Sequence, residues 1–379
     1  MYKLIIIIIS VILLIIGIYK IKFPFWSKQP VFHFHNLKYW IIPPGIIQHE
    51  NPEKNKFYDE KIFFDMYDNI PIKIKNHFAF FIKKHYLPNK QELYNPSKID
   101  VLNYLQSHNR KSYLSIMYDK NNLKRLVGTM SSRPLDCFIG NNKLPVQYVD
   151  FLCVHKKYRK KGLAPKIIYT HYVNCRDKKS EPVFLFKREG DVTSIVPLTA
   201  YNNYLFDISR WDKSVVFDEP TINTILITEN TFNYFFDVYE RLMKSKFKCI
   251  ITPHLNHIKS LLLSNQIFIT VTLINKQPYD IFIFHNTHTT YNGNKSMECI
   301  CSFKETDESV FVLGFMCSIS LIYNEMKFTR LFIENISNNN IILKKIIERY
   351  REVEKTKASY YFYNFGYRPF LSSEVFILN

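Results

Sequence analysis

The sequence predicts an α+β protein of two halves, with a largely antiparallel central sheet and one hydrophobic helix at the N-terminus. Three observations predict this fold class. Apolar residues make up 47% of the 379 positions, which suits a globular chain with a sizeable core. After residue 56, segments with helical spacing of apolar residues are interspersed with strand-like segments, and this pattern starts again near Phe206. The chain also opens with an uncharged apolar run, Leu4 to Ile18.

This run, "LIIIIISVILLIIGI", predicts a membrane anchor over residues 1–21. It is a little shorter than the ~20 residues that span a bilayer, but uncharged neighbours on both sides extend it. A cleaved signal peptide is the alternative, although no small-x-small cleavage site follows the run. Lys3 precedes it and Lys20, Lys22 and Lys28 follow it, so the positive-inside rule places the rest of the chain in the cytosol.

The first half, residues 22–205, begins with an irregular arm rich in Pro, His and aromatic residues up to residue 56. Periodicity then predicts a helix over 70–87 and a second over 96–108, with Ser97 as its N-cap. We expect a third helix over 164–175. The expected strands of this half are 61–68, 112–119, 123–139, 144–154 and 182–187, and the segment 199–207 is expected as a turn.

The second half, residues 206–379, repeats this mixture of elements. Helices are predicted over 230–246, 256–265 and 339–353, and the apolar run 309–326 fits either a long helix or a strand. The expected strands are 267–275, 279–287, 296–305, 330–336, 358–365 and 374–379. The sequence thus divides into an anchor and two α/β halves.

The formal net charge of +18 suggests an anionic partner: a nucleic acid, a membrane surface or a phosphorylated cofactor. Coding bias is the alternative for most of it, because Ile, Lys, Asn, Tyr and Phe are abundant and Gly occurs only nine times. No RNP pattern, zinc finger or recognition-helix motif supports nucleic-acid binding, so we expect no nucleic-acid partner. The seven cysteines are irregularly spaced without a CxxC pair, which predicts reduced thiols and no metal site.

One segment concentrates positive charge between a predicted strand and a predicted helix: "YVDFLCVHKKYRKKGLAPKIIYTHYV", residues 148–173. Six of the seven positions 155–161 are His, Lys or Arg. Gly162 permits a turn that a side chain would block, and a helix N-terminus offers free N–H groups. This arrangement suits a pyrophosphate, although a solvated basic loop is the plain alternative. "RKKGLA" also matches the R-x-x-G-x-A pattern with which GNAT acyltransferases bind coenzyme A.

The resemblance to one family extends well beyond this pattern. "DFLCVHKKYRKKGLAP", residues 150–165, is similar to the strand and basic loop of protein N-myristoyltransferases. "FPFWSKQPV", residues 23–31, looks like their aromatic segment over the acyl-CoA, and "YYFYNF" with "EVFILN" resembles their closing strands. "NKSMECICSF" in the second half is a weaker match. The resemblance implies two GNAT-like halves around a central sheet, in agreement with the elements above.

The resemblance also implies site residues. The acyl-CoA would lie against Pro24, Phe25 and Trp26, and its phosphates would be held by Lys160, Gly162, Leu163 and Ala164. Phe151 and Leu152 would supply the backbone N–H groups of an oxyanion hole, beside Cys153 and Val154. The main-chain carboxylate of the last residue, Asn379, would be the catalytic base.

The chemistry that this implies is direct attack of an N-terminal glycine amine on the thioester of myristoyl-CoA. Myristoyl-CoA is then a co-substrate, no permanently bound cofactor or metal is needed, and the acceptor is a protein with an N-terminal glycine. Cys153 is not required as a nucleophile, and a small core side chain is the better interpretation. His155, His254 and His257 lack acidic or Cys partners at ligand spacing, so we expect structural or surface roles.

Departures from the family concern the peptide side. Asp150 stands where the family has Asn, and it could hold the glycine ammonium or hinder its deprotonation. "YLPNKQELY", residues 86–94, replaces an acidic run and leaves Tyr94 as the candidate wall, while Thr289 takes the place of a serine. "VEKTKAS", residues 353–359, replaces a Gly-Asp-Gly segment. Lys355 and Lys357 there would disfavour basic peptides.

The leading hypothesis is a monomeric, membrane-tethered N-myristoyltransferase. One alternative is a divergent acyl-CoA-dependent acyltransferase with another acceptor. Another is a non-catalytic protein that binds acyl-CoA or acylated proteins. A retained terminal carboxylate argues against the binder, and the lost Gly-Asp-Gly segment argues against the family's usual substrate range.

Overall fold

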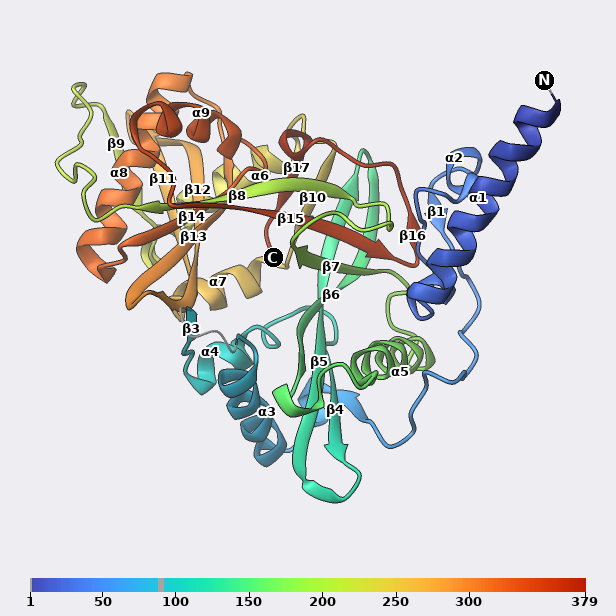
Figure 1. Ribbon diagram of the computed structural model, residues 1–379. Helices are drawn as coiled ribbons and strands as arrows, with labels where there is room; N and C mark the ends of the chain where they lie inside the picture. Colours follow the sequence, from blue (N-terminus) through green and yellow to red (C-terminus); the bar gives the residue numbers. More distant parts are fainter. Residues whose placement is uncertain (1, 88–91) are drawn as a thin grey trace.

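The computed structural model describes residues 2–87 and 92–379, and the predicted α+β class is confirmed (Figure 1). Residue 1 of the predicted anchor and residues 88–91, within the "YLPNKQELY" segment, lie outside the described residues. The helices of the described part are α1 (Tyr2–Lys22), α2 (Leu37–Ile41), α3 (Ile72–His85), α4 (Lys98–Asn103), α5 (Leu163–Asp177), α6 (Phe232–Met243), α7 (Leu255–Leu263), α8 (Glu308–Met326) and α9 (Asn339–Arg349).

Most strands of the described residues join one 15-stranded sheet with the path β17-β10-β5-β6-β7-β15-β8-β14-β13-β12-β11-β9. The first half of the chain contributes β2 (Phe63–Met66), β3 (Glu92–Tyr94), β4 (Tyr113–Asp119), β5 (Asn122–Ile139), β6 (Asn142–Val154), β7 (Phe184–Glu189) and β8 (Thr199–Asp207). The second contributes β9 (Ile222–Leu226), β10 (Cys249–Thr252), β11 (Ile267–Ile274), β12 (Gln277–Tyr291), β13 (Asn294–Phe303), β14 (Arg330–Glu334), β15 (Glu354–Tyr363) and β17 (Val375–Ile377). A separate ribbon pairs β1 (Gly45–Ile46) with β16 (Phe365–Gly366).

The two halves of the chain exchange strands within this sheet. β10 and β17, from the second half, extend the sheet beyond β5, and β15 lies between β7 and β8 (Figure 1). The predicted boundary between residues 205 and 206 falls inside β8, and the division into halves stays a prediction. Because β17 pairs with β10, and β10 with β5 of the first half, residue 379 lies in the middle of the molecule (Figure 1).

Helices cover both faces of the sheet. α3, α4, α6 and α7 share one apolar core that also takes in the chain end, with Phe78, Leu102, Phe235 and Phe376 among its buried members. α8 and α9 pack on the other face of the second half. α5 lies against β4, β5 and β6 in the first half (Figure 1). Between these helix layers, around the neighbouring strands β6, β7 and β15, the middle of the sheet has room for a cavity.

Most of the predicted elements form, including the capping box in which the Ser97 side chain accepts from the Asp100 N–H at 3.2 Å. The ambiguous run 309–326 is a helix, α8, because it packs through a wide buried face. The segment 199–207, expected as a turn, is strand β8, because it pairs with β14 and β15. Sequence patterns also missed three short strands, β3, β9 and β10. Each is three to five residues long and gains its hydrogen bonds from distant strands, so no local periodicity marks it.

Among the side chains that the structure describes, which leave out several in α1, one helix is long and apolar enough to cross a bilayer. That helix is α8, and its apolar window is 50% buried inside the protein. Since α8 contributes Phe311, Phe315 and Ile319 to a hydrophobic core, it is a core helix. α1 forms over the predicted anchor and extends from the body of the molecule (Figure 1).

Candidate active site

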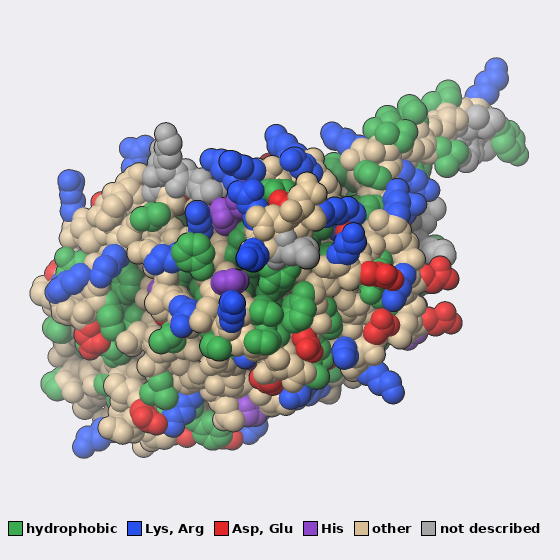
Figure 2. Space-filling view, turned by 90° about the horizontal axis from the view of Figure 1, so that it is seen from below, with side chains coloured by type: hydrophobic (Ala, Val, Ile, Leu, Met, Phe, Trp, Pro, Cys, Tyr) green, Lys and Arg blue, Asp and Glu red, His purple; other side chains and the backbone are tan. Residues whose placement is uncertain are grey.

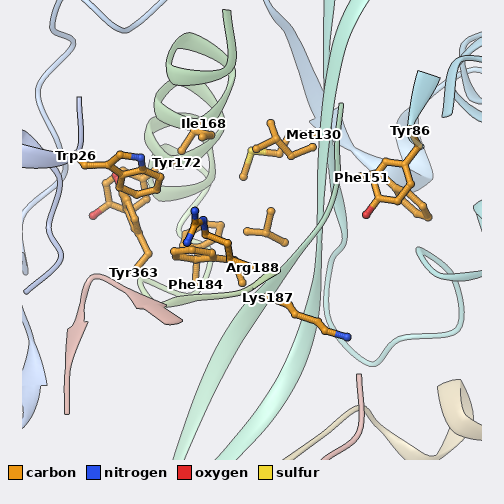
Figure 3. A pocket seen from close by; sticks show the side chains of 13 residues that line it. Trp26, Tyr86, Met130, Phe151, Ile168, Tyr172, Phe184, Lys187, Arg188 and Tyr363 are labelled. Carbon is orange, nitrogen blue, oxygen red and sulfur yellow. The ribbon is translucent and has the colours of Figure 1, made fainter. Parts of the chain in front are cut away.

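Two cavities meet in the middle of the sheet. The first has a volume of about 320 Å³ and is lined mostly by aromatic and aliphatic side chains (Figure 3). Its lining residues are Trp26, Tyr86, Met130, Val149, Phe151, Leu152, Ile168, Tyr172, Phe184, Phe186, Lys187, Arg188 and Tyr363. We call it the apolar cavity; its size and lining suit a hydrocarbon chain.

Strand pairing places the aromatic wall of the apolar cavity. β7 and β15 run antiparallel, with Phe184 opposite Tyr363 and Phe186 opposite Tyr361. Since side chains two residues apart share a face, Phe184 and Phe186 both face the cavity. Trp26, from the arm, stacks on Phe186 with ring centroids 6.0 Å apart and closes that side (Figure 3).

The second cavity, about 310 Å³, is polar and lies on the other side of Phe151. Tyr86, Phe151 and Lys187 line both cavities, so the two adjoin. Its wall contains the predicted residues Tyr94, Asp150, Thr289 and Asn379. It also contains charged and titratable side chains that sequence reasoning did not find: Glu92, Arg133, Lys187, Glu189, His285, His288, Glu298 and Glu354.

A β-bulge in β6 forms the junction between the cavities. Thr129 of β5 pairs with Cys153 and Ser131 pairs with Asp150, so Phe151 and Leu152 together oppose one residue. Phe151 has φ of 50°, a left-handed conformation that costs a non-glycine residue about 1–2 kcal/mol. Two buried hydroxyls stabilise the bulge: Thr129 donates to the Phe151 carbonyl and Ser131 to the Asp150 carbonyl, both at 3.1 Å.

The chain terminus forms part of the polar cavity. β17 runs parallel to β10, and the Leu378 N–H donates to the Ile251 carbonyl at 2.8 Å. Residues 375–378 are buried, so the end is fixed by packing on both sides. Tyr360 donates its hydroxyl to Asn379 Oδ1 at 3.0 Å. This hydrogen bond holds the Asn379 side chain at the cavity wall.

Asp150 forms a buried ion pair with Arg133, whose Nε lies 2.6 Å from Asp150 Oδ2. Arg133 is 1% exposed and its guanidinium also lies over the Tyr148 ring, 5.0 Å from the centroid. Burial raises the pKa of Asp150, while Arg133 opposes that rise. Arg133 therefore offsets the negative charge of Asp150, and Asp150 would attract a nearby ammonium group less than an unpaired Asp would.

Lys187 is the centre of a second buried charge cluster. It contacts Glu334 and lies 3.6 Å from Glu298, which accepts from Asn203 at 2.9 Å. Tyr201 donates to Glu334 at 2.8 Å. Burial raises the pKa of Glu334 to about 7, with the negative Glu298 nearby adding to the rise. Lys187 and Glu298 hold opposite charges beside a carboxyl that is readily protonated.

Three further carboxylates line the polar cavity: Glu92, Glu189 and Glu354. Burial raises the pKa of Glu92, and the charges of Glu189 and Glu354 raise it further, so the three lie near one another. Tyr291 donates to Glu354 at 2.7 Å. Within the described residues, none of the three forms an ion pair with Lys or Arg.

The sequence led us to expect Lys355 and Lys357 at the peptide site, but neither lysine lines the polar cavity. Glu354 and Thr356 of β15 line the polar cavity, whereas the alternating lysines do not. Lys355 lies over the Tyr204 ring, 5.0 Å from its centroid, and Lys357 pairs with Asp191 at 2.8 Å. The "YLPNKQELY" segment likewise supplies one acid to the cavity, Glu92.

The basic loop before α5 has the predicted form. Gly162 is the N-cap of α5 with φ of 72°, and Lys160 is also left-handed with φ of 61°. Arg159 ties the loop down by donating to the Val154 carbonyl at 3.1 Å and to the His85 carbonyl at 3.0 Å. Lys160 and Lys161 remain exposed beside the free N–H groups of the helix start, which suits a bound phosphate.

The predicted residues fall into four groups. Trp26, Phe151 and Leu152 line the apolar cavity, and Tyr94, Asp150, Thr289 and Asn379 line the polar one, where Thr289 pairs directly with Tyr94. Lys160, Gly162, Leu163 and Ala164 form the loop and helix start. Pro24, Phe25, Cys153 and Val154 line neither cavity; Phe25 packs behind Trp26 against Phe57 and α5.

The remaining reactive groups have structural surroundings. Burial raises the pKa of the Cys153 thiol to about 12, so it is no thiolate near neutral pH. His254 caps α7 by accepting from the Asn256 N–H at 3.3 Å, and buried His257 hydrogen-bonds the Gln106 carbonyl at 2.8 Å. Across the described part of the chain, no group of three or more His, Cys, Asp or Glu could hold a metal ion.

The chain is similar to known proteins both in sequence and in fold. Residues 56–179 match the family model of the myristoyl-CoA:protein N-myristoyltransferase N-terminal domain. This part of the chain is therefore similar to that N-terminal domain. A 56-residue segment is 39% identical to glycylpeptide N-tetradecanoyltransferase of Plasmodium falciparum, isolate 3D7, and spans 15% of this chain but only 13% of that relative.

The N-myristoyltransferase fold extends over nearly the whole molecule. A crystal structure of Saccharomyces cerevisiae N-myristoyltransferase with bound myristoyl-CoA superposes with a TM-score of 0.73 over 94% of this chain and 99% of that one, at 14% identity. A second structure of the yeast enzyme gives 0.71 over 93% and 90%, also at 14% identity. The second half therefore shares the fold of the yeast enzyme.

Gly162 allows a direct test of the phosphate loop. A Cβ added at Gly162 would meet nothing within 4 Å, although its φ of 72° strains any substitution, so a charged variant needs an uncharged one of the same shape beside it. We expect Gly162→Asp to weaken coenzyme A binding strongly, because it places a carboxylate at the helix start. Gly162→Asn is the matched control, since Asn tolerates a positive φ and has the same shape. Calorimetry that finds equal affinities for the two variants would exclude the loop as the phosphate site.

Glu334 predicts a specific pH dependence of stability. Its folded pKa of about 7 lies above the ordinary value of 4.5, so folding takes up a proton between these values. The unfolding free energy contributed by Glu334 is complete below about 4.5 and falls as pH rises to 7, by at most about 1.4 kcal/mol per pH unit. Glu334→Gln should remove that fall in denaturant titrations, whereas exposed Glu348→Gln should keep it. Parallel pH profiles for wild type and Glu334→Gln would contradict the assignment.

Proposed function

We propose that this protein transfers myristate from myristoyl-CoA to the N-terminal glycine amine of proteins. The observation that carries the proposal is the adjacency of the two cavities at Phe151. An apolar cavity closed by Trp26 suits the acyl chain, and a polar cavity with a main-chain carboxylate at its wall suits an amine. The family of the N-terminal domain and the yeast enzyme's structure with bound myristoyl-CoA support the same assignment.

In the proposed reaction, the glycine amine enters the polar cavity near Asn379. An α-amino group has a pKa of ~8, so at neutral pH it is largely protonated and must lose a proton before it attacks. The terminal carboxylate of Asn379 takes that proton as the general base. The free amine then attacks the thioester carbonyl, the amide bond forms, and coenzyme A leaves.

The bulge supplies the complementary charge stabilisation. The β5–β6 register is broken at Phe151 and Leu152, which makes their N–H groups candidates to bind the oxyanion as negative charge develops. Thr129 and Ser131 hold the carbonyls on this segment and so fix its direction. These backbone groups need no movement at the moment of reaction, which is what makes such donors effective.

Two other functions remain open to test. A divergent acyltransferase with another acceptor would use the same apolar cavity, and a non-catalytic protein would bind acyl-CoA without turnover. The terminal carboxylate at the polar cavity favours catalysis, and the free carboxylates there favour a cationic acceptor. The decisive experiment is incubation with labelled myristoyl-CoA and a panel of peptides with N-terminal Gly or Ala. Coenzyme A release with Gly peptides alone supports the proposal; binding without release supports the non-catalytic reading.

We also infer that α1 anchors the protein to a membrane, with the remainder in the cytosol. The apolar sequence of α1, its projection from the body and the basic residues that follow it support this. Its substrates would then be met near the membrane surface where their new acyl chain inserts. We expect a monomer, because each cavity is completed within one chain.

The chain end provides the first functional prediction. Asn379→Gln should retain most activity, because the carboxylate belongs to the main chain. A C-terminal extension converts that carboxylate into an amide and should lower kcat by about 10²–10⁴-fold, the usual contribution of a general base. Affinity for myristoyl-CoA, measured by calorimetry, should persist in the extended protein. Full activity of the extended protein would remove the terminal carboxylate from the mechanism.

The bulge provides the second prediction. Thr129→Val keeps the side-chain shape but removes the hydroxyl that donates to the Phe151 carbonyl. We expect kcat to fall by up to about 10²-fold, as for other small misplacements of reacting groups. Thr129→Ser retains the donor and is the control. Equal single-turnover rates for the Val and Ser variants would exclude this role for the hydroxyl.

The carboxylates of the polar cavity provide the third. Glu189, Glu354 and Glu92 should favour peptides with Lys or Arg downstream of the glycine. Exposed pairs contribute about 0.2–1 kcal/mol each, so Glu354→Gln should lower kcat/KM for basic peptides by up to about 5-fold and leave neutral ones unchanged. Lys357→Met, on the other face of β15, is the control. A uniform effect on basic and neutral peptides would contradict the subsite.

A further inference from the structure

The arm between α1 and the sheet carries exposed apolar side chains that the acyl-transfer site does not use. They are Phe23 at 42% exposure, Phe34 at 44%, Trp40 at 51%, Ile41 at 80% and Ile42 at 45%. We call this set the arm patch. None of these residues lines either cavity of the site. Large apolar side chains gathered on a surface mark a contact with a partner or with lipid.

The arm patch is held in place and turned outward. Tyr39 is 5% exposed and donates its hydroxyl to the Tyr367 carbonyl at 3.0 Å, so α2 is fastened to the body through one face. Trp40, the next residue, donates its indole N–H to the Phe34 carbonyl at 3.3 Å. Its indole polar group is satisfied within the arm, which leaves the ring free to enter an apolar surrounding.

The patch lies at the base of α1. The Tyr19 ring, in the last turn of α1, contacts Phe23, His33 and His35, with centroids 5.1, 4.8 and 5.2 Å apart. α2 and α1 stand beside each other at the edge of the molecule, away from the main sheet (Figure 1). Whatever surrounds the base of α1 therefore also meets the arm patch.

The segment that forms α1 and the arm patch is basic in sequence. Residues 1–49 contain five lysines and no Asp or Glu. Lys20, Lys22 and Lys28 are exposed, and exposed Arg368 lies beside Ile41 and Ile42 in a surface hollow. Lys and Arg side chains are visible near the base of the projecting helix (Figure 2). Apolar and aromatic side chains ringed by cations match the headgroup level of an anionic membrane.

The length of α1 brings the patch to that level. Its uncharged run, Leu4 to Ile18, rises ~22 Å at 1.5 Å per residue, which is less than the ~30 Å hydrocarbon core. A short span draws its flanking residues toward the bilayer. We propose that the arm patch inserts into the interface of the membrane that α1 enters, and that Trp40, Ile41 and Phe34 form a second contact which fixes the enzyme's orientation. This inference rests on the proposed anchoring by α1.

The test uses the full chain reconstituted in vesicles of phosphatidylcholine and phosphatidylserine, with brominated lipids as quenchers of tryptophan fluorescence. The chain has three tryptophans, so the Trp40 signal is the difference between wild type and Trp40→Phe. We expect the Trp40 emission to be blue-shifted and quenched, most strongly by bromine near the headgroups. Ile41→Glu should reduce this quenching by placing a charge in the patch. Trp211→Phe, a buried residue of the second half, is the control and should leave it unchanged.

The outcomes separate the two proposals. Protein that does not float with the vesicles contradicts anchoring by α1, and the arm proposal with it. Protein that floats while Trp40 keeps solvent-like, unquenched emission leaves the anchor intact and overturns the arm proposal. Emission that is blue-shifted but unquenched by any brominated lipid would mean that protein, such as a second copy of the chain, covers the patch, and this too overturns the proposal.

Discussion

The β-bulge at Phe151 is the constraint on which the site depends. A regular β5–β6 ladder would direct Asp150 and Phe151 to opposite faces and would engage the N–H groups of this segment in the sheet. The extra residue interrupts the ladder, lets Phe151 form a wall of both cavities, and places an unusual backbone conformation where they meet. The buried hydroxyls of Thr129 and Ser131 offset part of its cost.

The strand exchange makes this position catalytically useful in our account. β15 from the second half brings Tyr363 to the apolar cavity and Glu354 to the polar one. β17 then brings the chain end to the polar cavity from the opposite side of the sheet path. Neither half of the chain lines either cavity alone, because both contribute residues to each.

The buried charges show how the polar cavity tolerates its acids. Asp150 pairs with Arg133, and Glu298 pairs with Lys187. Burial raises the pKa of Glu334 to about 7. The remaining free carboxylates, Glu92, Glu189 and Glu354, give the cavity a surplus of negative charge. A protonated amine or a basic peptide is the natural complement of such a surface.

The sequence predicted the elements and the local motifs, but not the contacts between distant strands. The shape of the loop before α5 could be predicted because Gly162, the basic run and the helix start are contiguous, and the buried surroundings of Cys153 followed from the same segment. Arg133 was missed because its partner Asp150 is on a neighbouring strand, and Glu354 was missed because the lysines beside it dominate the local composition. Pro24 and Phe25 were expected in the acyl site, yet the turn after α1 directs only Trp26 into it.

The most direct test is the structure of the complex with a non-hydrolysable ketone analogue of myristoyl-CoA, in which a methylene group separates the sulfur from the carbonyl. The account predicts the acyl chain in the apolar cavity against Trp26 and Phe186, and the phosphates at the start of α5. The analogue's oxygen at the reacting position should lie within hydrogen-bond distance of the Phe151 and Leu152 N–H groups, with the Asn379 carboxylate across the polar cavity. An acyl chain bound elsewhere, or N–H groups of Phe151 and Leu152 that remain bonded within the sheet, would contradict it.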